Sequence, residues 1–331
     1  MSFDLWNIVL ATFTTFYFAL GLSLLYVYFG ATPYPIIKRS KREHYFYDAV
    51  SSHIIPFPSL KDSPTITLSV IVPAYNEEKR LSTMLDECLD FLEDRCKEIP
   101  GFSYEVIIVS DGSTDKTPLL AWLYAKNFGS EKVRLLDLKP NRGKGGAVRL
   151  GVFSARGSVI LFADADGATK FSDITKLEKS LLQITKCDYT KNPEKAADLH
   201  AVICGSRSHL EEESIANRSF CRVFLMHGFH FLVWLLTVRS IRDTQCGFKL
   251  FTRKTAKCLF SNIHVERWAF DVELLYLAEL LKIPTSEIAV NWTEIDGSKI
   301  VPIFSWLQMG KDLFLIWFRY RIGAWKISEL P

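Results

Sequence analysis

Four clusters of polar and glycine residues mark this chain, and each follows directly after a short apolar segment. They combine carboxylates, a lysine and glycine-flanked backbone N–H groups, which are the groups that hold metal ions and phosphates. Such a combination points to a phosphate-bearing ligand and a divalent cation. The clusters are Pro73-Ala-Tyr-Asn-Glu77, Asp111-Gly-Ser-Thr-Asp115, Asn141-Arg-Gly-Lys-Gly-Gly146 and Asp164-Ala-Asp-Gly167.

Asp164 and Asp166 form the strongest of these signals. Two carboxylates separated by one small residue, on a turn after an apolar segment, supply hard oxygen ligands. Mg²⁺ or Mn²⁺ takes such ligands while it also binds substrate phosphates. An isolated D-x-D is usually a pair of solvated acids, so the prediction of a metal site depends on its position at the end of a strand.

Asp111 and its neighbours allow two interpretations that are compatible with each other. Thr114 or Asp115 can cap the helix that follows, which makes the cluster a turn. Asp111 then stays free, and we expect it to accept hydrogen bonds from the base or ribose of a nucleotide.

The glycine-rich segment 141–146 opens a predicted helix, so its backbone N–H groups can face an anion while Lys144 adds positive charge. It is not a Walker A loop, because Gly145 stands where Ser or Thr is required. No strand runs into a G-x-G-x-x-G either. Both observations argue against a P-loop NTPase and against a dinucleotide-dependent dehydrogenase.

Alternating strands and helices are expected to position these clusters. Because strand and helix alternate, the sequence predicts an α/β fold with a mostly parallel sheet wound by right-handed crossovers. The carboxyl ends of such strands share one edge, where ligands bind. Strands are predicted over 68–72, 104–110, 133–138 and 158–163, and helices over 77–95, 115–128 and from 144 onward.

The N-terminal segment 6–29 is apolar throughout and, as a helix of about 36 Å, would cross a hydrocarbon core of about 30 Å. A cleaved signal peptide would require a basic start and a shorter apolar run, and a buried core helix would keep a polar face. Asp4 is the only charge before the segment, whereas four basic residues lie within 38–42. The positive-inside rule therefore places the N-terminus outside or in a lumen and the remainder in the cytosol.

The composition agrees with attachment to a membrane. Hydrophobic residues make up 48% and aromatic residues 13% of 331 positions, while the net charge of +3 is too small to argue for nucleic-acid binding. The seven cysteines form no C-x-x-C pair, which suits a reducing compartment.

Two further apolar segments leave alternatives open. Residues 223–238 are too few for a second crossing and favour a buried or interface-lying helix. Residues 301–325 mix aromatic and basic side chains, which fits either an interfacial helix on a lipid bilayer or an amphipathic core helix. The expected regions are a lumenal N-terminus (1–5), a transmembrane helix (6–29), a cytosolic juxtamembrane linker (30–66), a catalytic domain (67–295) and a C-terminal membrane-interface region (296–331).

The motifs SVIVPAYNEE, IIVSDGSTDKT, NRGKGGAVRLG and LFADADGA, in this order, resemble the family 2 glycosyltransferases of GT-A fold over about residues 66–295. RGKGGAVRLG, ADADGATKFSD, GSR and DTQCGFKLF are similar to one branch, the dolichyl-phosphate β-glucosyltransferases of the endoplasmic reticulum. That resemblance implies a Rossmann-like GT-A domain, one N-terminal membrane helix and a cytosolic active site. It also implies UDP-glucose as donor, dolichyl phosphate as acceptor, and Mg²⁺ or Mn²⁺ as cofactor.

The resemblance assigns roles to individual residues. Asp271 is implied either as a general base or only as the N-cap of a helix over 272–281. The other roles are donor-nucleotide binding for Pro73, Tyr75, Glu77, Asp111, Lys144 and Asp164, metal binding for Asp164 and Asp166, catalysis for Asp166, and acceptor-phosphate binding for Arg207 and Arg222.

Two departures limit what the resemblance transfers. Ala168 stands where mannosyl relatives carry a metal-binding Gln, so their ligand set does not apply here. His264-Val-Glu-Arg267-Trp268 lacks the Gln of the Q-x-x-R-W motif, which argues against chain polymerisation. The expected reaction is inverting transfer of glucose to dolichyl phosphate, which supplies a lipid-linked donor for N-glycan assembly. The alternatives are a related synthase that uses GDP-mannose and a non-catalytic membrane scaffold.

Overall fold

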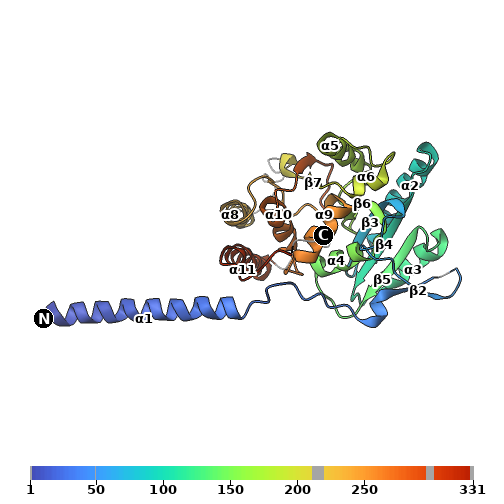
Figure 1. Ribbon diagram of the computed structural model, residues 1–331. Helices are drawn as coiled ribbons and strands as arrows, with labels where there is room; N and C mark the ends of the chain where they lie inside the picture. Colours follow the sequence, from blue (N-terminus) through green and yellow to red (C-terminus); the bar gives the residue numbers. More distant parts are fainter. Residues whose placement is uncertain (1, 49, 211–219, 296–301, 329–331) are drawn as a thin grey trace.

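The computed structural model describes residues 2–48, 50–210, 220–295 and 302–328; in the helices that start at residues 2, 220 and 302, side chains are described from residues 6, 228 and 308 onward. Its centre is a seven-stranded sheet in the order β5-β4-β3-β6-β8-β7-β9 (Figure 1). Strand β8 runs antiparallel to β6 and β7, and the other pairs are parallel. The strands are β3 (Ile66–Ala74), β4 (Tyr104–Asp111), β5 (Val133–Leu138), β6 (Gly157–Ala163), β7 (Val202–Ser206), β8 (Phe248–Thr252) and β9 (Thr285–Ala289).

The first four of these strands confirm the sequence prediction, because each is an apolar run that the sheet buries on both faces. In β3, Val70 pairs with Val106 of β4 on one side and with Leu161 of β6 on the other. Such continuous apolar runs are typical of parallel strands that are covered by helices on both faces.

Helices cover the two faces of the sheet. The apolar side chains of α2, α3, α5 and α6 join one core cluster, and those of α4, α8, α9, α10 and α11 join a second one. The helices are α2 (Leu81–Glu98), α3 (Thr117–Phe128), α4 (Lys144–Phe153), α5 (Ile174–Thr185), α6 (Pro193–Ala197), α8 (Phe220–Leu236), α9 (Arg253–Asn262), α10 (Phe270–Leu280) and α11 (Pro302–Arg321).

Strand order creates a crevice beside β3. The chain passes from β3 to β4 and β5 on one side, and then returns to place β6 on the other side of β3. At such a reversal the two flanking loops diverge and leave room for a ligand at the carboxyl ends of the strands. Because β8 is antiparallel, its first residues lie at this same edge.

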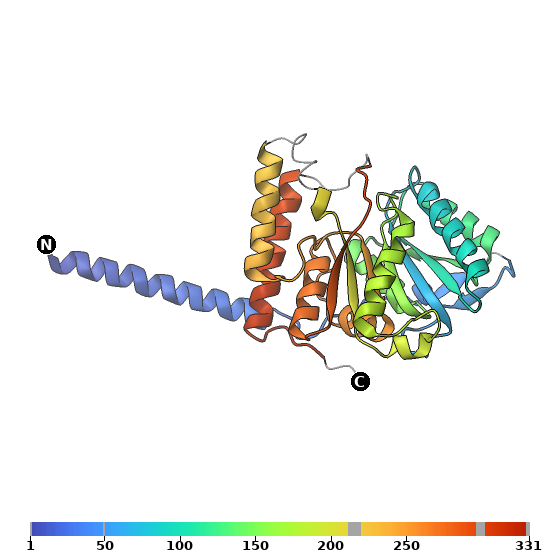
Figure 2. The same cartoon turned by 90° about the horizontal axis from the view of Figure 1, so that it is seen from above.

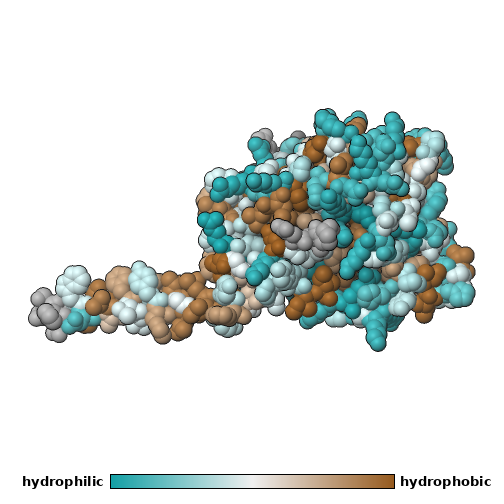
Figure 3. All heavy atoms as spheres, viewed as in Figure 1, coloured by the Kyte–Doolittle hydropathy of each residue, from teal (hydrophilic) through white to brown (hydrophobic). Residues whose placement is uncertain are grey.

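The N-terminal helix α1 (Ser2–Phe29) extends away from the domain, and its apolar residues face outward along its length (Figure 3). Within the described residues it is the one helix long and apolar enough to cross a membrane, and the apolar segment 6–29 has no buried residue. The prediction of a membrane anchor agrees with this exposure.

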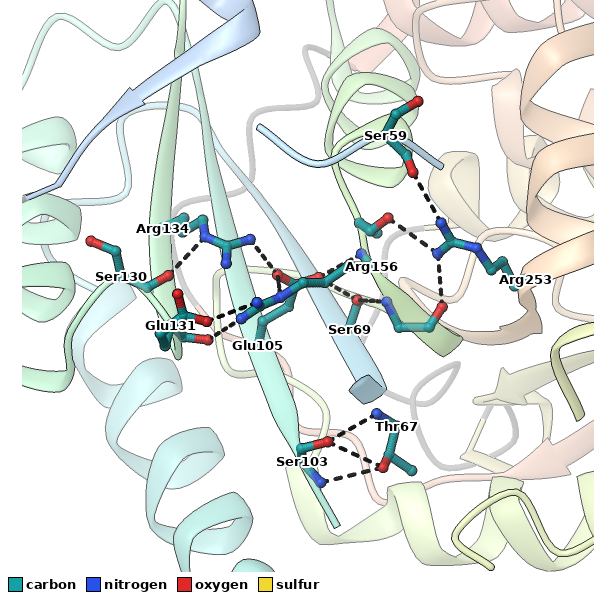
Figure 4. Close-up of polar contacts among 12 residues, drawn as sticks. Ser59, Thr67, Ser69, Ser103, Glu105, Ser130, Glu131, Arg134, Arg156 and Arg253 are labelled. Carbon is teal, nitrogen blue, oxygen red and sulfur yellow. Dashed lines mark hydrogen bonds and ion pairs between the residues drawn. The ribbon is translucent and has the colours of Figure 1, made fainter. Parts of the chain in front are cut away.

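The segment after α1 is attached to the domain rather than hanging free. It contains the hairpin β1 (Tyr45–Tyr47) and β2 (Ile54–Pro56), and Arg134 of β5 lies over the ring of Phe46. Figure 4 shows the polar contacts nearby: the buried Glu105 binds Arg134 and Arg156, and Arg253 donates to the carbonyl of Ser59. The predicted linker 30–66 therefore packs on the domain over much of its length.

Helices α8 and α11 lie side by side at the end of the domain nearest α1 (Figure 2). In α11 the buried residues Met309, Leu313 and Ile316 recur every three or four positions, as in an amphipathic helix that packs on a core. The outer face of α8 is also apolar, since Phe231 and Trp234 are 57% and 53% exposed. Helices α8 and α11 therefore pack on the core and also expose apolar side chains to the outside.

Candidate active site

An ion pair joins two of the predicted clusters at the crevice. The ammonium of Lys144, the first residue of α4, lies 2.8 Å from Oδ1 and 2.9 Å from Oδ2 of Asp164, which follows β6. Burial alone would lower the pKa of Lys144, but the charges of Asp164 and Asp271 raise it. The lysine is therefore a permanent cation beside the first carboxylate of the D-x-D.

The backbone of β8 approaches Asp164 so closely that only glycine fits at position 247. The Asp164 N–H donates to the Gly247 carbonyl at 3.0 Å, and a Cβ on Gly247 would overlap the Asp164 carboxylate. Gly247, the glycine of the DTQCGFKLF motif, thus leaves the space that the Asp164 carboxylate occupies.

The second carboxylate, Asp166, accepts a hydrogen bond from the N–H of Ala168 at 3.0 Å. Burial and the neighbouring charge of Asp164 raise the pKa of Asp166. Two carboxylates that repel each other in a partly buried turn are stabilised by a cation between them. The chemistry of the pair therefore suits a hard divalent ion.

A cation here would have to take most of its ligands from elsewhere. Within the described ranges, no group of three or more His, Cys, Asp or Glu side chains could hold a metal ion. Mg²⁺ and Mn²⁺ commonly bind through one or two carboxylates and complete their shells with water and substrate phosphates. Asp164 and Asp166 fit a cation that is held jointly with a diphosphate.

Asp111 fastens the glycine-rich loop, which the sequence did not predict. Its Oδ1 accepts from the N–H of Arg142 at 2.8 Å and its Oδ2 from the N–H of Gly143 at 2.9 Å. Burial raises the pKa of Asp111 to about 6, although these two hydrogen bonds oppose the shift. A carboxylate has about four acceptor positions, so two remain for a ligand.

The glycines of this loop act mainly through close packing. Gly143 has φ of +85°, and a Cβ on Gly145 would lie 2.5 Å from the side chain of Phe270. The N–H of Gly146 donates to the Glu266 carbonyl at 2.9 Å. Because several of its N–H groups already have protein partners, the loop offers fewer to an anion than we expected.

The first loop after β3 packs against the Asp111–Asp115 turn. Asn76 has φ of +54°, and its Oδ1 accepts from the N–H of Thr114 at 2.8 Å. Glu77 binds the guanidinium of Arg80 through both oxygens, whereas Tyr75 is 41% exposed and Pro73 is half-buried near the end of the strand. Tyr75 is thus the exposed side chain within the 73–77 cluster.

Asp271 does not cap α10, which corrects one of the two interpretations. The N-cap residue is Ala269, while Asp271 lies in the first turn and accepts from the Lys249 ammonium at 2.6 Å. Lys249 also donates to the Cys246 carbonyl at 2.6 Å, and its side chain is fully buried. Burial raises the pKa of Asp271, with Lys249 and Lys144 opposing the shift.

Lys249 is a residue of the site that was not predicted from the sequence. The available signal was a lone lysine in the apolar run Phe248-Lys-Leu-Phe251, which a buried strand can hold only with a charged partner. Both lysine ammoniums lie near one ring, since Lys144 Nζ is 5.3 Å and Lys249 Nζ 5.6 Å from the centroid of Phe162. Charges of alternating sign therefore run from the crevice into the core: Asp164 and Lys144 are partly exposed, and Asp271 and Lys249 are buried behind them.

Arg207 forms a bidentate ion pair with Asp243, a residue that the sequence analysis did not single out. Nε lies 2.7 Å from Oδ2 and Nη2 lies 2.9 Å from Oδ1, and the guanidinium stacks over Trp292. Burial would lower the pKa of Arg207, but Asp243 raises it. Of the two predicted acceptor arginines, Arg222 has its backbone in α8 but its side chain lies outside the described residues.

Comparisons with known proteins show which family the chain belongs to. The sequence model described as glycosyl transferase family 2 matches residues 69–260. The dolichyl-phosphate beta-glucosyltransferase of Drosophila melanogaster is 62% identical over 94% of this chain and 93% of its own length. The human enzyme of that name is 56% identical over the same shares of the two chains, and the Saccharomyces cerevisiae enzyme is 42% identical over 81% and 79%.

Solved structures share the fold at much lower identity. Glucosyl-3-phosphoglycerate synthase from Mycobacterium tuberculosis, in its phosphoglyceric acid complex, aligns with a TM-score of 0.53 at 16% identity over 78% of this chain and 80% of its own. The central sheet and its flanking helices are therefore a GT-A-like fold. The chain belongs to glycosyl transferase family 2 and, within it, to the family of the dolichyl-phosphate beta-glucosyltransferases.

Proposed function

We propose that this protein transfers glucose from UDP-glucose to dolichyl phosphate with inversion, giving dolichyl β-D-glucosyl phosphate and UDP. The observation that carries the proposal is the array Asp164, Lys144, Asp271 and Lys249 at the β3–β6 edge, in a chain 42–62% identical to enzymes of that name. Beside this array, the carboxylates of Asp164 and Asp166 are available to a cation and the ammonium of Lys144 to phosphates.

The donor would lie along the crevice with its uridine toward β4. Asp111 has two acceptor positions left for the base or ribose, and Tyr75, which is exposed on the loop after β3, is a second candidate contact. Pro73 and Glu77 would shape this end of the site, because Pro73 pairs with Val109 of β4 and the N–H of Glu77 donates to the hydroxyl of Thr117 at 2.7 Å. Lys144 is placed to contact the diphosphate.

Asp164 and Asp166 would hold Mg²⁺ or Mn²⁺, which supplies positive charge to the departing diphosphate when bound. A Mn²⁺ complex of the mycobacterial synthase with UDP-glucose supports this assignment, since it aligns with a TM-score of 0.50. Lys144 would contribute a second positive charge, in a site where burial strengthens electrostatic interactions.

The acceptor phosphate would be bound by Arg207, with Arg222 as the second candidate. Arg207 is already oriented by its two hydrogen bonds to Asp243 and keeps further N–H groups for an anion. A phosphate monoester has a second pKa of about 6, so the acceptor oxygen is largely ionised at neutral pH. Asp271 is committed to Lys249, and we assign it the role of orienting that lysine rather than of accepting a proton.

The membrane surroundings follow from the same proposal. Helix α1 would anchor the protein in the endoplasmic reticulum membrane with residues 1–5 in the lumen, and the basic residues after it would keep the domain in the cytosol. The exposed apolar side chains of α8 and α11 would meet the bilayer, where a lipid acceptor must enter.

The decisive experiment incubates purified protein with Mg²⁺, dolichyl phosphate and either UDP-glucose or GDP-mannose, and identifies the lipid product. Dolichyl β-glucosyl phosphate from UDP-glucose is expected. A mannosyl product would favour the alternative donor, and no product with either donor would favour a scaffold.

Arg207→Ala tests the acceptor side of the site. We expect the KM for dolichyl phosphate to rise at least about tenfold while the KM for UDP-glucose changes little, because Arg207 is assigned to the acceptor phosphate. Initial rates with each substrate varied in turn measure both constants. A larger rise for UDP-glucose would refute the assignment.

A further inference from the structure

A buried carboxylate connects the membrane-proximal segment to the glycine-rich loop. Glu43 lies at the end of the segment that leaves α1, and only 2% of it is exposed. Its two oxygens lie 2.9 and 2.7 Å from Nη2 of Arg142, and Oε1 also accepts from the N–H of Lys139 at 3.3 Å. Glu43 and Arg142 are 99 residues apart, so the pair is a tertiary contact.

Arg142 carries this contact onward to the crevice. Its side chain binds Glu43, while its backbone N–H donates to Oδ1 of Asp111 at 2.8 Å. One residue thus has its side chain held by the membrane-proximal segment and its backbone held by the residue assigned to the nucleotide. A displacement of the Arg142 side chain would move the N–H that fixes Asp111.

The same segment also reaches the opposite end of α4. Arg39 donates through Nε and Nη2 to the Glu43 carbonyl at 2.9 and 2.7 Å, and through Nη2 to the hydroxyl of Ser154 at 2.8 Å. Ser154 is the C-cap residue of α4, and Arg142 lies just before its first residue, Lys144. Residues 39–43 therefore bracket the helix that carries the lysine beside Asp164.

The segment itself is tied to the body of the domain. The N–H of Lys326, after α11, donates to the Pro33 carbonyl at 2.8 Å, and Ser40 donates its N–H to Oε2 of Glu43 at 2.8 Å. In Figure 1 the chain after α1 runs along the edge of the domain toward β2 and β5. These contacts hold the segment in one position between the membrane helix and the crevice.

We propose that Glu43 is a positioning residue for the donor site, which makes residues 39–43 a functional part of the catalytic domain. Removing one partner of a buried ion pair leaves the other charge without compensation, so the loop would rearrange. The proposal rests on the proposed function only in taking the Asp111 end of the crevice as the nucleotide site.

Glu43→Gln in the full-length protein tests the proposal, because glutamine keeps the shape and removes the charge. We expect the Kd for UDP, measured by calorimetry, and the KM for UDP-glucose to rise at least about tenfold. The KM for dolichyl phosphate is expected to stay within about twofold, since no contact joins Glu43 to Arg207.

Two further variants make the result specific. Glu131→Gln removes one of the two carboxylate partners of Arg156, an 86% exposed one, and is expected to leave UDP binding unchanged. Glu43→Ala combined with Arg142→Ala should weaken UDP binding by much less than the product of the two single effects, since both remove the same contact.

Unchanged UDP binding in folded Glu43→Gln, or an equal rise in both KM values, would overturn the proposal. If Glu43→Gln does not fold, Glu43→Asp, which keeps the charge but shortens its reach, replaces it with the same two criteria. UDP binding is measured without turnover, so failure of the wild-type protein to make a glucosyl lipid contradicts the proposed reaction and not this positioning role.

Discussion

The ionised side chain of Asp166 lowers the free energy of unfolding, because its carboxylate lies partly buried beside Asp164 in a turn. Its pKa is raised, so ionisation is less favourable in the folded protein than in the unfolded chain. Lys144 offsets the charge of Asp164 at 2.8 Å, whereas the partner that Asp166 has in the described residues is the N–H of Ala168.

Asp166→Asn should therefore separate stability from function. We expect the melting temperature to be unchanged or raised, because the repulsion from Asp164 disappears, while kcat/KM falls at least about hundredfold. Thermal unfolding and initial rates at saturating Mg²⁺ measure the two effects. Retained divalent-dependent turnover would contradict the assignment of Asp166 as a metal ligand.

Asp111 gives a pH dependence of donor binding. Its folded-state pKa of about 6 lies above the ordinary carboxyl value, since burial disfavours the charge. Its contribution to the free energy of unfolding is thus greatest at low pH and is lost as the pH rises through about 6. The effect of pH on donor binding has the opposite sign. Binding should be tighter at higher pH, because the ionised carboxylate of Asp111 holds the glycine-rich loop.

The affinity for UDP-glucose should therefore fall as the pH is lowered through about 6. Both phosphates of UDP-glucose are esterified, so the donor itself does not titrate in this range. Calorimetric titrations between pH 5 and 8 measure the effect. Asp111→Asn should bind more weakly and lack this acid limb, and an identical limb in the variant would assign the titration to another group.

At the scale of elements, the packing of α4 against the loop before α10 decides where the phosphate-facing end of α4 lies. Gly145 and Gly146 allow this approach, since the side chain of Phe270 and the carbonyl of Glu266 lie against them. Neither glycine has a positive φ, so their role is space rather than backbone conformation. The glycine spacing that resembles an anion-binding loop in the sequence therefore serves, at Gly145 and Gly146, to let the α10 region pack against α4.

Gly145→Ala should separate α4 from α10. We expect a loss of about 1–3 kcal/mol in the free energy of unfolding and a raised KM for UDP-glucose, because Lys144 shifts with the helix. Gly310→Ala in α11 is the matched control, since a Cβ there meets nothing within 4 Å. It should be neutral or slightly stabilising, and equal losses in both variants would show that packing at Gly145 is not the cause.

At the scale of the whole molecule, three helices gather at the end that we propose faces the membrane. Figure 2 shows α8 and α11 standing next to each other where α1 leaves the domain. Phe231, Trp234 and Phe314 expose about half of their surface on this pair, and Arg239 lies over the ring of Trp234. Exposed apolar side chains with basic neighbours are typical of an interfacial surface.

Replacing Phe231 and Trp234 together by Ser should weaken the use of the lipid acceptor. The KM for dolichyl phosphate in vesicles is expected to rise at least about tenfold, because each side chain loses up to about 1.5–3 kcal/mol of apolar burial, whereas UDP affinity stays constant. Leu119→Ser and Leu123→Ser on α3, which are also exposed, serve as the control. Equal effects of both double variants on the lipid KM would argue against a bilayer contact by α8.

Many of the helices and strands could be predicted from the sequence, because the patterns that indicate them are local. Apolar runs of strand length, turn residues after them and the uncharged segment 6–29 each identify an element without knowledge of its neighbours. Strands β3 to β6, helices α3 and α4, the position of the D-x-D after β6 and the apolar helix α1 were predicted in this way. The predicted start of α2 was too early, since Asn76 has a positive φ and residues 77–80 form a turn.

Only the tertiary structure decided which charges meet. The ion pairs join residues far apart in the sequence: Lys249 and Asp271 are separated by 22 residues, Arg207 and Asp243 by 36, and Arg142 and Glu43 by 99. A buried charge requires a partner, but nothing in a local pattern says which one, because the partner is set by the crossing of strands and helices. For the same reason the sequence treated residues 30–66 as a linker, whereas the fold buries Glu43 within it.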